Sequence, residues 1–170
     1  MKTIKTITVI AAAALLMGAA EALADSTNAT LTVNASVGNA LRLELGGSSS
    51  ASINFTVAVN SPDSIPASEN PLSVSAKARV APGSAVTLTC QANGDLSGTN
   101  GTIGIENVTW TVASGSGFQG GTMSKNAPVT VGSWTGPGQR NGSLNFYLAN
   151  SWDYATGNYS AIVTYTLTAP

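Results

Sequence analysis

Apolar and polar side chains alternate along much of this chain, most regularly in its last fourteen residues, GNYSAIVTYTLTAP. The apolar members of this stretch share one parity: Tyr159, Ala161, Val163, Tyr165, Leu167 and Ala169. Successive side chains of a β-strand point to opposite faces, so this period of two predicts a strand with one buried face. We expect that strand to begin at Gly157 and to turn its apolar row toward a core.

Similar short runs recur along the chain and are separated by Gly, Asn, Ser and Pro. We expect strands over residues 28–37, 40–45, 52–59, 72–80, 84–92, 103–113, 127–134, 142–150 and 157–170. About nine short strands and no helix outside the first 24 residues are typical of an antiparallel, immunoglobulin-like β-sandwich. A closed β-barrel is the alternative fold.

Local signals refine this expectation. Pro82-Gly83 supplies turn chemistry between two strands, which predicts a hairpin over residues 72–92. The parity of residues 103–113 slips near Glu106-Asn107, which favours a β-bulge. We expect residues 93–102 and 114–126 to be loops.

The first 24 residues have the features of a secretory signal peptide. Lys2 and Lys5 precede an apolar run, and Ala22-Leu23-Ala24 is a small-x-small cleavage site. An uncleaved anchor is the alternative, but the apolar run is short for a membrane span. We therefore expect export, with residues 25–170 forming a single β-sandwich domain that does not insert into the membrane.

The composition argues against enzymatic chemistry. The chain has no histidine, which removes Ser-His-Asp catalysis and the commonest metal ligand. Its carboxylates are scattered singly, without calcium-loop spacing. We expect no enzymatic activity, no cofactor and no metal. Basic residues are few and unclustered in sequence, so we also expect no binding of nucleic acid.

Five further side chains carry specific expectations. Cys90 and Trp110 lie on alternating strands, and we expect both in the core; an intermolecular disulfide or a reactive thiol is the alternative role for the single cysteine. Trp134, Trp152 and Tyr154 lie near turns, where aromatic rings can stack on sugars or cover the ends of a core. These three residues are candidate glycan contacts.

The two ends of the predicted domain are informative together. Residues 25–37 carry a second alternating apolar row, formed by Ala29, Leu31, Val33, Ala35 and Val37. With the closing strand, this segment resembles chaperone–usher pilins, in particular alpha-type (class 5) fimbrial subunits; spore coat protein U-type domains share the layout. The C-terminal pattern of that family is a glycine fourteen residues from the end and apolar residues in step with the penultimate position. Gly157 and the row through Ala169 match it, although Ala169 replaces the usual aromatic residue.

The resemblance implies a structural role. Residues 25–37 would act as a donor strand for a neighbouring subunit, and residues 157–170 would border the acceptor groove, giving a head-to-tail polymer of identical or related subunits. It also implies a periplasmic chaperone and an outer-membrane usher as partners, with transit through the periplasm to a fimbrium on the cell surface. The alternative is a secreted sandwich that completes itself with its own strand and binds a glycan or protein. Because only "GNA" (residues 38–40) joins the two segments, we expect pairing between subunits.

Overall fold

The computed structural model describes residues 29–170, which lie downstream of the predicted signal peptide and of residues 25–28. The chain divides into two units, residues 1–35 and residues 36–170. Within the first unit, the described residues 29–35 form no strand and are exposed. The strand expected over residues 28–37 is therefore wrong for the single chain, in which no described strand pairs with residues 29–37. The strands all lie in the second unit.

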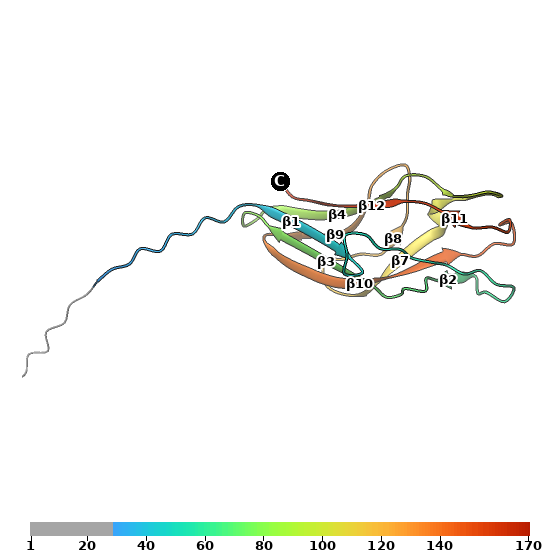
Figure 1. Ribbon diagram of the computed structural model, residues 1–170, viewed down its shortest axis with the longest axis horizontal. Helices are drawn as coiled ribbons and strands as arrows, with labels where there is room; N and C mark the ends of the chain where they lie inside the picture. Colours follow the sequence, from blue (N-terminus) through green and yellow to red (C-terminus); the bar gives the residue numbers. More distant parts are fainter. Residues whose placement is uncertain (1–28) are drawn as a thin grey trace, which may run out of the picture. The chain divides into compact units, whose positions relative to one another are not determined.

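Alternating apolar residues build two main layers, and every strand pairing is antiparallel. One sheet has the order β1 (Ala40–Leu45), β3 (Leu72–Arg79), β10 (Gly138–Ala149), β7 (Val108–Ser114) and β8 (Gly121–Thr122), with β2 (Ser64–Pro66) also on β10. The facing sheet has the order β12 (Val163–Thr168), β4 (Ala85–Ala92) and β9 (Val129–Thr135). A small third sheet consists of β11 (Tyr159–Ser160), β5 (Leu96–Gly98) and β6 (Gly101–Ile103). The predicted antiparallel, immunoglobulin-like β-sandwich is confirmed (Figure 1).

The core lies between the two main sheets. Its largest side chains include Trp110 on β7, Phe146 on β10 and Leu88 on β4, each with no more than 1% of its surface exposed. The Trp110 Nε1 donates a hydrogen bond to the Gln119 carbonyl oxygen at 2.8 Å, which satisfies its buried polar atom. The core positions predicted for Trp110 and Cys90 are confirmed.

The predicted hairpin over residues 72–92 is wrong. β3 pairs with β1 and β10, whereas β4 pairs with β12 and β9, so the connection around Gly83 crosses from one sheet to the other. This crossing places the buried rows of the two strands face to face across the core. Turn residues specify that a chain reverses, and they do not specify that the flanking strands hydrogen-bond to each other.

Other local expectations also need correction. Residues 103–113 contain a 3-10 turn, η1 (Ile105–Asn107), between β6 and β7, where we expected a bulge in one strand. The Asp95 side chain accepts a hydrogen bond from the Ile105 N–H at 3.1 Å, which holds the backbone away from a strand conformation. Residues 93–102 include most of the β5–β6 hairpin and residues 114–126 include β8, so neither segment is only a loop.

Residues 52–59 form no strand, contrary to expectation. The Asn54 N–H donates to Glu69 Oε2 at 2.7 Å, and the Asn54 carbonyl accepts from the Ser68 N–H at 2.9 Å. The Glu69 carboxylate therefore accepts the backbone N–H of Asn54 that would otherwise be available to a neighbouring strand. Ile53 and Phe55 are nevertheless half-buried against the core, as their alternation predicted.

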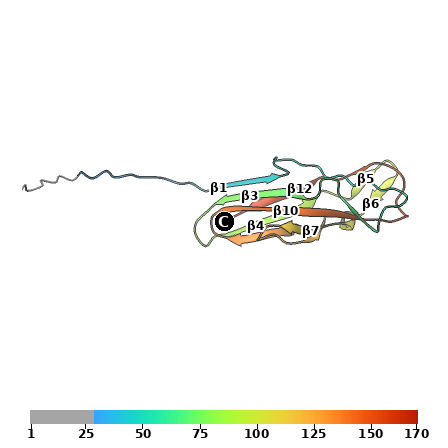
Figure 2. The same cartoon turned by 90° about the horizontal axis from the view of Figure 1, so that it is seen from below.

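The sandwich has two distinct ends. β1 begins at the end where the C-terminus lies, which we call the arm end, because residues 36–39 lead into β1 there (Figures 1 and 2). β2, β11, β5 and β6 lie toward the opposite end, which we call the far end (Figures 1 and 2). Among residues 29–170, no helix is long and apolar enough to span a membrane.

Candidate assembly site

The segment before β1 has an apolar row that the chain does not bury. Residues 29–39, which we call the arm, form no strand and are exposed throughout. The side chains of Leu31, Val33 and Val37 are 87%, 81% and 70% exposed. Large apolar groups in a regular alternating segment are expected to lie against a sheet, so this row is suited to pairing with another strand.

The two main sheets are joined along one side. There the Gln119 N–H donates to the Val131 carbonyl at 2.8 Å, and the Ser133 N–H donates to the Gly117 carbonyl at 2.8 Å. These bonds connect β9 to the segment between β7 and β8. Phe118 closes this side, packing so tightly that a Cβ added to Gly142 would lie 2.7 Å from its ring.

The other side of the sandwich is open. Within the part of the chain that the structure describes, β12 pairs only with β4, and β1 pairs only with β3 apart from a bridge between Leu45, its last residue, and Ser48. Some Cα atoms of β1 and β12 lie within 8 Å of each other, yet no ladder joins the two strands. We call these two free edges the open seam. Their unpaired backbone groups are a template for another strand.

The side chains at the seam have the burial of an incomplete core. On β12, Val163, Tyr165 and Leu167 are half-buried, while the threonines between them are exposed. On β1, Leu43 and Leu45 are half-buried, and Leu41 is 44% exposed. Apolar rows that are only half covered on two neighbouring edges fit a site that one more apolar strand would complete.

The seam edge continues beyond β1 through residues 51–59. Asn54 is hydrogen-bonded to Ser68 and Glu69, which lie a few residues before the start of β3. Residues 51–59 therefore follow the same edge of the sheet that β1 forms beside β3. Val57 and Val59 on this segment are 50% and 75% exposed. The sequence predicted only a strand over residues 52–59, and it did not indicate that this segment lies at the edge of the sheet.

The predicted groove-edge residues divide between two strands. Tyr159 lies on β11, and the row from Val163 to Leu167 lies on β12. The break falls at Ala161-Ile162, where Asn93 Oδ1 accepts a hydrogen bond from the Ile162 N–H at 3.1 Å. All six apolar residues of the predicted row remain half-buried, while Gly157 is exposed just before β11.

Cys90 lies directly behind the seam. It is opposite Tyr165 in the β4–β12 register and is 1% exposed. Burial raises the pKa of the Cys90 thiol to about 11, so the thiol stays protonated at neutral pH. Burial also raises the pKa of Tyr165. A buried, protonated thiol is unreactive, which fits the packing role expected for it.

The candidate glycan contacts do not form one surface. Trp134 lies near the end of β9, at the arm end, with the Arg140 guanidinium 5.9 Å from its ring centre. Trp152 and Tyr154 follow β10, at the far end. Trp152 is 85% exposed, whereas the Tyr154 hydroxyl donates to the Ala149 carbonyl at 2.9 Å. The structure therefore brings Trp152 and Tyr154 into one turn and places Trp134 elsewhere.

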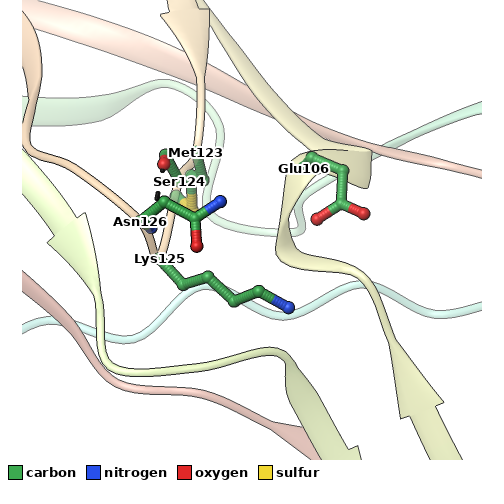
Figure 3. A pocket seen from close by; sticks show the side chains of 5 residues that line it. All are labelled: Glu106, Met123, Ser124, Lys125 and Asn126. Carbon is green, nitrogen blue, oxygen red and sulfur yellow. Dashed lines mark hydrogen bonds between the residues drawn. The ribbon is translucent and has the colours of Figure 1, made fainter.

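A small polar pocket of about 410 Å³ lies at the far end and is lined by Glu106, Met123, Ser124, Lys125 and Asn126 (Figure 3). Lys125 Nζ donates to Asp95 Oδ2 at 2.5 Å. This hydrogen bond lowers the pKa of Asp95 and raises the pKa of Lys125, so both groups stay charged at neutral pH. A general acid or base needs a pKa near the working pH, whereas the pKa values of Asp95 and Lys125 are both shifted away from neutral pH. That the protein is not an enzyme stays a prediction.

Comparison of the chain with models of known protein families gave no match, and comparison with curated proteins gave none either.

Proposed function

We propose that this protein is a structural subunit of a bacterial surface fibre or coat, assembled head to tail by donor-strand complementation. The arm of one copy would occupy the open seam of the next. The observation that carries this proposal is the exposure of Leu31 and Val33, 87% and 81%, in a segment whose alternation is that of a buried strand. Every copy also carries half-buried apolar rows on β1 and β12, which would accept the arm of a neighbouring copy.

The dimensions fit this arrangement. An extended strand rises about 3.3 Å per residue, so the arm reaches about 36 Å, close to the length of the twelve-residue β10 that runs the length of the sandwich. One arm is therefore long enough to pass along the whole β12 edge. The short side chains of Ala29 and Ala35 would fit shallow positions, while the larger members of the row fill deeper ones.

The energetics also favour a durable contact. Burying each of Leu31, Val33 and Val37 contributes about 1.5–3 kcal/mol, and each ladder hydrogen bond adds about 1 kcal/mol. Together these contributions offset an association cost of about 4–15 kcal/mol. Slow dissociation is the expected result, as a fibre requires.

The proposal includes export by the signal peptide and assembly at the cell surface, with a periplasmic chaperone and an outer-membrane usher as partners. The predicted signal peptide, residues 1–24, lies outside the described residues. A second candidate function is binding of a glycan or protein by a self-completed sandwich. The exposed Trp152 favours it, since an aromatic ring held outside a turn can stack on a sugar.

One experiment separates these functions. The chain from Asp25 to Pro170 is run unheated on a detergent gel, beside the same chain without residues 25–37. We expect a ladder of multimers from the intact chain and none from the shortened one. A self-completed sandwich would instead give a monomer under every condition. A ladder that survives the deletion would show that assembly does not use the arm.

A further inference from the structure

The charged side chains of the sandwich are sorted by sign along its length. The arm end carries four basic residues and one acidic residue among residues 29–170, a formal charge of +3: Arg42, Lys77, Arg79 and Arg140, with Glu44. The strand register shows that these residues lie near the same end of the sheet. Ala40 at the start of β1 is opposite Arg79, and Lys77 is opposite both Arg42 and Gln139, the second residue of β10.

The far end has the opposite sign. It carries five acidic residues and one basic residue of the described chain, a formal charge of −4: Asp63, Glu69, Asp95, Glu106 and Asp153, with Lys125. Asp63 lies beside the end of β10, because its carbonyl accepts the Asn150 N–H at 2.8 Å. Glu106 lies two residues before Val108, which is opposite Leu148. Asp95 follows the end of β4 and is bonded to Lys125.

Few of these charges are neutralised within the subunit. The described residues contain two ion pairs, Arg42–Glu44 and Lys125–Asp95. This leaves Lys77, Arg79 and Arg140 without an acidic partner at one end, and Asp63, Glu106 and Asp153 without a basic partner at the other. Arg42 and Lys77 are also direct cross-strand neighbours, an arrangement of like charges that is unfavourable within a sheet.

The two ends are too far apart to compensate each other. β10 spans them, a distance of about 40 Å, whereas the Debye length is about 8 Å at physiological ionic strength. Each end therefore presents its own field to other molecules. A surface of +3 and a surface of −4 on opposite ends of one chain are complementary between two copies placed end to end.

The far end also has an apolar contact surface. Val59 is 75% exposed and Trp152 is 85% exposed. Val59 precedes the acidic Asp63 by four residues, and Trp152 directly precedes Asp153. The two loops that carry them are tied together, because Asn150 also donates from Nδ2 to the Ser61 carbonyl at 3.3 Å. Apolar side chains surrounded by charges of one sign are typical of the centre and rim of a protein interface.

From this arrangement we infer that the acidic far end of one copy docks against the basic arm end of the next. The inference rests on the proposed function, and it adds a second contact to the strand exchange. The partner is another copy of this chain, because its two ends supply both halves of the complementarity. Docking of the ends speeds the encounter and holds the arm beside the seam while it pairs.

Charge-reversal variants of the mature chain test this inference. The basic-end variant combines Lys77→Glu and Arg79→Glu, and the acidic-end variant combines Asp63→Lys, Glu106→Lys and Asp153→Lys. Each variant makes both docking ends carry the same sign. The variant with all five changes has opposite signs again, in reversed order. Lys77→Arg with Arg79→Lys conserves the charge and serves as the control, and circular dichroism checks the folding of each protein.

The readout is the initial rate of assembly, followed by light scattering. At about 10 mM salt, where the Debye length is about 30 Å, we expect each single-end variant to assemble at least about tenfold more slowly than the wild type. The five-change variant recovers most of the rate, and the control equals the wild type. At about 1 M salt, where the Debye length is about 3 Å, the differences disappear.

Two results would overturn the inference while leaving strand exchange intact. One is equal rates for all variants at low salt, in a chain whose assembly still requires the arm. The other is a five-change variant that is as slow as the single-end variants, which would show that the charges act separately and not as a pair. Failure of the proposed function gives a different result, because deletion of residues 25–37 would then leave assembly unchanged.

Discussion

The substitution Val33→Asp tests the donor role of the arm most economically. Val33 is 81% exposed, so its replacement removes almost no contact from the folded subunit. In a docked arm the same residue would be buried, and its loss removes about 1.5–3 kcal/mol of apolar burial. An aspartate at that position must also be desolvated or protonated, which costs several kcal/mol more. The combined loss is at least about 3 kcal/mol, or roughly a hundredfold in affinity.

The neighbouring residue provides a matched control. Asn34 has the opposite parity in the arm and is also exposed, so Asn34→Asp adds the same charge on the face that would point to solvent. We expect Val33→Asp to abolish the ladder on an unheated detergent gel, with Asn34→Asp assembling as the wild type does. Both variants should unfold at the same denaturant concentration as the wild type in their monomeric form. Equal ladders from the two variants would refute the assignment of Val33 to the buried face.

Three other predictions concern the sandwich itself. Because burial raises the pKa of the Cys90 thiol to about 11, from an ordinary value of about 9, the protein is most stable below about pH 9 and loses stability as the pH rises from about 9 through about 11. Urea unfolding across this range measures the loss, and a flat profile would contradict it. Leu144→Ala in the core should lower the free energy of unfolding by about 2–5 kcal/mol, whereas Leu31→Ala in the arm should leave that of the monomer unchanged. Gly142→Ala should lower the thermal midpoint, because the added Cβ would lie 2.6 Å from the Ser114 carbonyl oxygen and 2.7 Å from the Phe118 ring. Gly38→Ala is the control and should be neutral, because a Cβ there meets no atom within 4 Å. Equal thermal midpoints for the two glycine variants would argue against the close packing of Phe118 on the closed side.

The sequence predicts the fold class and most strand positions because alternation reports directly on which side chains face a core. It identifies β4 and the apolar row of β12 for that reason. It cannot predict strand partners, because the turn at Pro82-Gly83 is compatible with a hairpin and with a crossing between sheets. It also misses residues 51–59 as part of the seam, since their backbone is held by the Glu69 side chain from a distant position.

The alternating apolar row of the arm was predictable, but the strand expected over residues 28–37 does not form in the single chain. Alternation over residues 29–37 does not say whether the strand pairs within the chain or stays exposed, and the exposure of Leu31 and Val33 supports pairing between copies. The sorting of charge along the sandwich was not visible either. Arg42, Lys77 and Arg140 are widely separated in sequence, and only strand register brings them to one end.

The central claim is that the arm of one copy pairs with β12 of another, and cysteine cross-linking between two tagged proteins tests it directly. One protein carries Asn34→Cys on the outward face of the arm, and the other carries a cysteine at Thr164, Thr166 or Thr168, the exposed positions of β12. Both have Cys90→Ser, so that no other thiol is present. The account predicts that mild oxidation of the mixture joins the two tags in one disulfide-linked species for at least one of the three positions. No such species at any position, or a disulfide formed within a single chain carrying both cysteines, would contradict it.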